Sequence, residues 1–140
     1  GETHNWWGAN DRKWNLLLQQ IVPEHPDLAI HADALRDLDH TARAAVEWIV
    51  TMREGLRLLK RPDQGVLHVP YEHLCANPRG WACKLEEYLG LERDKVFEDY
   101  AAKTLSNPAR AIELKLPDWL RTIFDEIELA RVEAAKRCAL

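Results

Sequence analysis

The sequence lacks the glycine-rich loops with which many enzymes hold phosphate groups. Its 6 glycines form neither GxxxxGK[ST] nor GxGxxG, and none follows an expected strand and opens a helix. Serine is nearly absent too, and Ser106 has no nucleophile-elbow sequence around it. These absences argue against a phosphotransferase with a phosphate loop and against a serine hydrolase.

Cysteine is scarce, and the cysteines are well separated in the sequence. The 3 cysteines contain no CxxC pair, which disfavours a disulfide framework and a zinc ribbon. The 6 histidines are scattered, HExxH is absent, and the spacing of His68 and His73 does not favour a ligand pair. We therefore expect free thiols in a reducing compartment, a cytoplasmic location and no metal.

The chain also lacks a basic excess and a long apolar run. Its 19 Lys and Arg face 23 Asp and Glu, giving a formal charge of -4, which argues against binding to nucleic acid or an anionic membrane. No apolar stretch approaches a membrane span, and the polar, aromatic start GETHNWWGAND is not a signal peptide. The length of 140 residues suits one domain, and the start without Met suggests a fragment or a processed chain.

Helical patterns dominate what is present. The clearest is a stripe of apolar residues at three- and four-residue steps after the capping candidate Asp39. Asn10 or Asp11, Asn77 and Asp94 are further capping candidates, and the composition around 61–65 predicts a turn. The expected helices span about 10–22, 39–60, 77–90, 94–104 and 117–137.

Residues 66–71 alternate in the manner of a strand, and they are the one clear strand pattern in the chain. A lone strand cannot satisfy its own backbone donors and acceptors. Either it pairs with a copy of itself, or its sheet lies in chain that is not present. Tyr71 and Glu72 stand at its carboxyl end, where open α/β sheets bind ligands.

A loop between the last two expected helices gathers hydroxyls and cations. Thr104, Ser106, Arg110 and Lys115 together suit a phosphate, because hydroxyls supply short donors and guanidinium a planar fork. The alternative is that all four are solvated loop residues, and spacing alone favours that alternative.

The stretch VLHVPYEHLCANPRGWACKLEEYLGLERD resembles the C-terminal region of bacterial-type sulfotransferases that use the activated sulfate donor PAPS. In that family a strand ends in Tyr-Glu, and an Asp/Asn-Pro turn, an amphipathic helix and a Leu-Gly-Leu close follow. NWWGANDRKW and ARAAVEWIVTMREGL are similar to other parts of the same family, so the resemblance covers about residues 5 to 125. The matching residues are Tyr71, Glu72, Leu74, Asn77, Pro78, Leu85, Leu89, Gly90 and Leu91.

The resemblance implies an α/β fold with a parallel sheet like that of nucleotide kinases. This chain would supply a mostly helical part of that fold, with one strand at about 66–71. Residues 1–140 would form a single domain, the C-terminal part of a sulfotransferase domain without its phosphosulfate loop. The whole enzyme would transfer a sulfuryl group from PAPS to a hydroxyl or amine of a small molecule or carbohydrate. Whether this chain is itself an enzyme stays open, because the family's catalytic base lies upstream of the matched region.

The resemblance also assigns roles to residues. Tyr71 would contact the adenine end of the nucleotide, and Thr104 and Ser106 would approach it. Arg110 and Lys115 stand where the family has a basic loop near the 3′-phosphate, although the family's Arg-Lys-Gly is not present. Glu72 is expected to be structural, holding backbone or an arginine.

The tryptophans divide into two groups. Trp48 and Trp81 fall in helical stripes and are expected in the core. Trp6, Trp7 and Trp14 cluster near the start, where they would line an acceptor pocket or be covered by absent chain. If the chain exists alone, these aromatics would pair two copies or rearrange. The alternative to an enzyme is a non-catalytic helical module that descends from a sulfotransferase and binds a protein.

Overall fold

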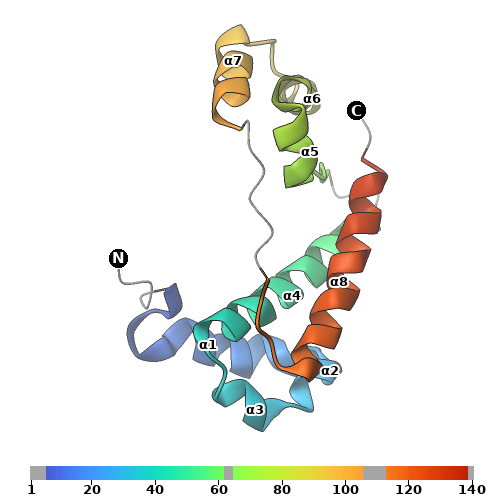
Figure 1. Ribbon diagram of the computed structural model, residues 1–140. Coiled ribbons are helices and arrows are strands. Elements are labelled where there is room, and N and C mark those ends of the chain that lie inside the picture. Colours follow the sequence, from blue (N-terminus) through green and yellow to red (C-terminus); the bar gives the residue numbers. More distant parts are fainter. Residues whose placement is uncertain (1–5, 62–64, 106–112, 139–140) are drawn as a thin grey trace. The chain divides into compact units, whose positions relative to one another are not determined.

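The computed structural model describes residues 6–61, 65–105 and 113–138 (Figure 1). They form two compact units; helix α8 (Asp118–Lys136) has residues in both, and helix α4 (His40–Leu58) belongs to unit 1 except for Leu58. Unit 1 holds the described residues up to Arg57 together with Leu114–Ala130. Unit 2 holds those from Leu58 to Glu113 and from Arg131 onward. No helix in the described ranges is long and apolar enough to cross a membrane.

Unit 1 is built from short helical segments and parts of the two long helices. In chain order they are η2 (Ala9–Asp11), α1 (Arg12–Leu16), η3 (Leu17–Ile21), η4 (Val22–Glu24), α2 (Pro26–Ala29), α3 (Ala32–Arg36), α4 (His40–Leu58) and α8 (Asp118–Lys136).

The first expected helix forms, but with changing geometry. It runs as α-helix in α1, widens to a π-helical turn in η3, and tightens to a 3-10 turn in η4, which contains Pro23. The expected side-chain cap is wrong: Asn10 and Asp11 both have a left-handed φ of 54°, and Asp11 makes no capping hydrogen bond. The Asp11 carboxylate instead accepts a 2.8 Å hydrogen bond from Arg43 Nη1.

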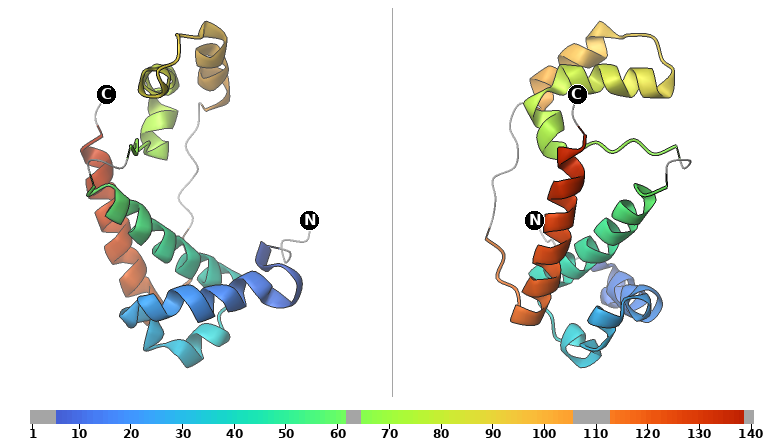
Figure 2. Two further views of the ribbon diagram at one scale, coloured as in Figure 1. Left: turned by 180° about the vertical axis from the view of Figure 1, so that it is seen from behind. Right: turned by 90° about the vertical axis from the view of Figure 1, so that its right-hand side faces the viewer.

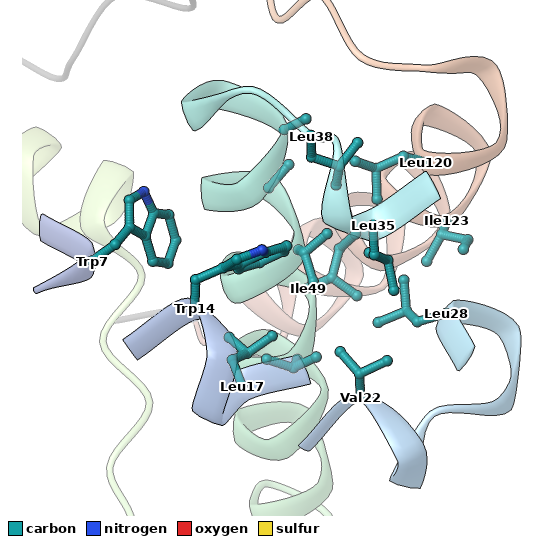
Figure 3. Packing of buried hydrophobic residues seen from close by; sticks show 14 residues of the cluster. Trp7, Trp14, Leu17, Val22, Leu28, Leu35, Leu38, Ile49, Leu120 and Ile123 are labelled. Atoms are coloured by element: carbon teal, nitrogen blue, oxygen red, sulfur yellow. The ribbon is translucent and has the colours of Figure 1, made fainter. Parts of the chain in front are cut away.

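The core of unit 1 is a continuous cluster of apolar side chains, shown in Figure 3. α4 supplies the largest share, and its N-terminus is capped as expected, since Ala42 N donates to Asp39 Oδ1 at 2.8 Å. Trp48 on α4 and Phe124 on α8 lie with ring centroids 4.5 Å apart at the edge of the cluster. The buried members are Trp7, Trp14, Leu17, Val22, Leu28, Leu35, Leu38, Ala42, Ala45, Val46, Ile49, Val50, Leu120 and Ile123.

Unit 2 contains α5 (Tyr71–Ala76), α6 (Pro78–Leu89), α7 (Lys95–Thr104) and the end of α8. α6 and α7 lie side by side, as Figure 2 also shows. The side chain of Asn77 caps α6 by accepting from Gly80 N at 3.0 Å, and Asp94 caps α7 by accepting from Val96 N at 2.8 Å. Both caps match the sequence predictions.

The predicted strand and α/β fold are wrong for the part of the chain that the structure describes, which contains helices and no strand. Residues 65–70 have no regular structure, and α5 already begins at Tyr71. Pro70 stands at the N-cap with extended dihedral angles of -64° and 126°, and it has no N–H to give to a ladder. An alternating pattern makes a strand only when a neighbouring strand accepts its hydrogen bonds, and the described residues supply none.

Candidate functional site

Tyr71 is the first residue of α5, and its side chain is exposed. The residue retains 48% of its accessible surface, so a ligand can reach it. A hydrogen bond with Cys75, one turn later in the helix, raises the pKa of the Tyr71 hydroxyl. The hydroxyl therefore stays protonated at neutral pH and can donate a hydrogen bond, but it cannot act as a base.

Glu72 pairs with Arg131 at the end of α8. Arg131 Nη1 donates to Glu72 Oε2 at 3.1 Å, and Nη2 lies 3.1 Å from Oε1. The hydrogen bond from Arg131 lowers the pKa of the Glu72 carboxyl. This confirms the prediction that Glu72 is structural and holds an arginine. The pair joins residues 59 positions apart and fastens the end of α8 to α5 within unit 2.

His68, His73 and Cys138 meet next to this ion pair. Cys138 Sγ lies 3.1 Å from His68 Nδ1, and His73 Nδ1 lies 3.3 Å from the Cys138 carbonyl oxygen. Desolvation, together with the charges of Arg131 and His73, lowers the pKa of His68. A neutral His68 can accept a hydrogen bond from the Cys138 thiol. This contact joins Cys138 to the segment before α5.

Thr104 ends α7 and lines an apolar hollow of about 170 Å³ in unit 2. The hollow opens between α5, α6 and α7, and Tyr71 is not part of its wall. Such a hollow suits an apolar or aromatic group rather than a phosphate. Its lining is Leu74, Pro78, Ala82, Leu85, Phe97, Tyr100, Ala101, Thr104 and Leu105.

The structure does not test the other three nucleotide candidates, Ser106, Arg110 and Lys115, against Tyr71 and Thr104. Ser106 and Arg110 lie outside the described residues. Lys115 is exposed in the irregular segment before α8, which belongs to unit 1, whereas Tyr71 and Thr104 belong to unit 2. Their roles in nucleotide binding stay predictions.

The three N-terminal tryptophans have different surroundings within unit 1. Trp7 and Trp14 are 1% and 2% exposed, and their rings meet edge to face at 5.4 Å. Trp6 is exposed, and its Nε1 donates to Glu47 Oε2 at 2.9 Å while Lys13 Nζ sits 4.1 Å from its ring centroid. Of the three, Trp6 alone is exposed to solvent. An acceptor pocket or a dimer contact formed by these tryptophans would therefore use Trp6.

A cluster that the sequence analysis missed lies between α6 and α7. Cys83, Glu86 and Glu98 bring one sulfur and two carboxylate groups within 4.8 Å of one another. Arg93 lies beside them: its Nε donates to Glu98 Oε1 at 2.7 Å and lies 3.4 Å from Glu86 Oε2. Desolvation raises the pKa of the Cys83 thiol. The spacing of Cys83 and Glu86 on one helix face was readable beforehand, but the position of Glu98 depends on how α7 packs.

Neither a family model, nor a curated protein, nor a solved structure matches the chain.

Proposed function

We propose that the chain is the C-terminal part of a PAPS-dependent sulfotransferase and contacts the adenine end of the nucleotide through Tyr71. The sequence block from Val66 to Asp94, which resembles that family, supports the proposal. The observation that carries it is the half-exposed phenol ring of Tyr71 at the start of α5. An exposed ring can lie against a purine while its protonated hydroxyl donates to the base.

Two caps in the block agree with what the resemblance requires of the chain after Tyr71. Asn77 caps α6, with Pro78 in its first position, so the chain turns into a helix at the expected place. Gly90 ends α6 in the left-handed conformation at φ 66°, and Leu91 N then bonds back to Glu86 O at 2.8 Å. These features support a folded block around Tyr71.

The proposed contribution is binding rather than chemistry. Sulfuryl transfer needs a positioned acceptor, a general base and groups that stabilise charge in the in-line transfer. The Tyr71 hydroxyl stays protonated at neutral pH, so it does not serve as the base. We therefore propose that catalysis, and the choice of a small-molecule or carbohydrate acceptor, depend on groups other than Tyr71.

The proposed location is the cytoplasm. Cys75, Cys83 and Cys138 are all free thiols, which suits a reducing compartment.

A second candidate function is a non-catalytic module that binds a protein. It is favoured by the apolar side chains that unit 2 leaves exposed: Val96 by 77%, Tyr100 by 65% and Leu89 by 62%. Surfaces of this kind mark protein contacts when they are contiguous.

Titration calorimetry with adenosine 3′,5′-bisphosphate separates the two candidates. We expect the chain to bind, and Tyr71→Ala to weaken binding about tenfold, in line with loss of one stacked ring. Tyr71→Phe should keep most of the affinity because the ring remains. Tyr88→Ala is the matched control, since Tyr88 is a second tyrosine of unit 2 with 45% exposure, and it should bind like the parent chain.

Absence of heat at millimolar nucleotide would overturn the nucleotide proposal and leave the protein-binding module. Equal loss in Tyr71→Ala and Tyr88→Ala would show that the affinity does not come from Tyr71.

A further inference from the structure

The cluster of Cys83, Glu86 and Glu98 has the composition of a metal site. Cys83 and Glu86 are three residues apart on α6, so both side chains leave the same face of the helix. Glu98 comes from α7, which packs beside α6. Their donor atoms lie within 4.8 Å of one another, although Glu98 belongs to a different helix from Cys83 and Glu86.

Glu86 supplies an independent indication that the cluster takes a cation. The residue is only 3% exposed. Its Oε1 accepts a 2.8 Å hydrogen bond from Asp94 N, but Oε2 is buried and accepts no hydrogen bond. A buried carboxylate oxygen without a hydrogen bond is unfavourable, because it has lost water and gained no donor.

Arg93 lies close to Glu86 Oε2, but it gives that oxygen no hydrogen bond. Its guanidinium is directed at Glu98, with Nε at 2.7 Å and Nη2 at 2.6 Å from Oε1. The 3.4 Å from Arg93 Nε to Glu86 Oε2 is an ion pair that lacks hydrogen-bond geometry. The Arg93 side chain is 63% exposed, so it can turn into solvent without disturbing the interior of unit 2.

We propose that Cys83, Glu86 and Glu98 bind a thiophilic divalent cation, with Zn²⁺ as the best match, in place of the Arg93 guanidinium. A thiolate with two carboxylates suits zinc, whereas calcium and magnesium prefer oxygen donors alone. Zinc bonds of about 2.0–2.3 Å place tetrahedral ligands roughly 3.3–3.8 Å apart. The donor atoms lie within 4.8 Å of one another, so small side-chain movements would bring them to that spacing.

Binding converts the Cys83 thiol to a thiolate, and the released proton passes to solvent. Three protein ligands leave a fourth position for water, and the bound ion joins α6 to α7. The proposal does not depend on the nucleotide function, since Tyr71 and Thr104 are not among the ligands.

The test uses the full chain with chelator-buffered Zn²⁺ and, separately, with Co²⁺. We expect micromolar or tighter Zn²⁺ affinity and a thiolate-to-cobalt charge-transfer absorption. Cys83→Ala should abolish that absorption and weaken Zn²⁺ at least tenfold, and Glu86→Gln should weaken Zn²⁺ at least tenfold while keeping an acceptor for Asp94 N. Arg93→Gln should tighten Zn²⁺, because the competing cation is gone.

Two variants control for unspecific binding. Cys138→Ser removes another thiol of unit 2, and Glu87→Gln removes the exposed carboxylate next to Glu86; neither should change the affinity or the cobalt spectrum. Helix content by circular dichroism checks that each variant is folded. No cobalt–thiolate absorption in the parent chain, or Zn²⁺ affinity unchanged in folded Cys83→Ala and in Arg93→Gln, would overturn the proposal and leave an ion pair between Arg93 and two carboxylates.

Discussion

The two units of this chain differ in how completely they bury their large apolar residues. Unit 1 buries a continuous cluster drawn from its short helices, α4 and α8, and Leu28, Leu35 and Ile49 in it are 0% exposed. Unit 2 buries Trp81 fully, but its other buried residues are small or polar, and it leaves large apolar side chains in solvent. The exposed ones are Val66, Tyr71, Tyr88, Leu89, Leu91, Val96, Phe97 and Tyr100.

The difference separates two sources of helix stability. In unit 1 the helices are held by tertiary packing, since each fully buried side chain contributes roughly 1.5–3 kcal/mol. In unit 2 local features contribute more to helix stability: the Asn77 and Asp94 caps and the left-handed Gly90. The ion pair between Glu72 and Arg131 adds one long-range contact to them. Unit 2 exposes the larger set of large apolar side chains, although Trp6, Ile30 and Leu129 of unit 1 are also exposed, and the sites proposed at Tyr71 and at Cys83 lie in unit 2.

The largest expected contrast comes from truncating one leucine in each unit. Leu28→Ala should lower the free energy of unfolding of unit 1 by about 2–5 kcal/mol, because it leaves a cavity in a packed core. Leu89→Ala should change the stability of unit 2 by less than about 0.5 kcal/mol, because that side chain is 62% exposed. Urea unfolding with hydrogen exchange resolved by residue measures both. A comparable loss in Leu89→Ala would mean that unit 2 packs as tightly as unit 1.

Replacing one glycine in each unit should change helix stability by a smaller amount, and in opposite directions. Gly90→Ala should destabilise α6 by about 1 kcal/mol, because φ is 66° there and a side chain strains the backbone although space is open around it. Gly55→Ala should stabilise α4 by about 0.5–1 kcal/mol, because Gly55 lies within the helix and nothing lies near its added methyl group. Hydrogen exchange of α6 and α4 amides checks the two signs, and stabilisation by Gly90→Ala would contradict the left-handed cap.

The smallest contrast is a pH effect from one ion pair in each unit. Hydrogen bonds from Arg53 and Arg131 lower the pKa of Asp27 in unit 1 and of Glu72 in unit 2. A lowered folded-state pKa stabilises the fold above the unfolded pKa of about 4, and this contribution is lost as pH falls through the folded value. Both carboxylates are partly exposed, so each effect should stay below about 1 kcal/mol.

Asp27→Asn and Glu72→Gln test this by removing the acid-dependent loss from one unit at a time. Thermal unfolding between pH 3 and 7 should show a flatter pH dependence in each variant. A parent chain whose stability rises as pH falls through this window would contradict the sign of both shifts.

Local structure was largely predictable from the sequence. The caps at Asp39, Asn77 and Asp94 and the glycine stop at Gly90 all occur where the residue types indicated them, because each depends on a few neighbouring atoms. The cap predicted at Asn10 or Asp11 does not form, and the reason is a distant residue that local sequence does not reveal. Arg43, 32 positions from Asp11, holds that carboxylate instead.

What the sequence alone determined about this protein is where its long helices begin and end and which face of each is apolar, since periodicity and capping act within a few residues. Tertiary structure decided the rest. It gave residues 65–70 no regular structure, buried Trp7 and Trp14 in unit 1, joined Glu72 to Arg131, and set Glu98 beside Cys83 and Glu86. Each of these outcomes depends on groups far apart in the chain, and their meeting is governed by how helices pack rather than by any local preference.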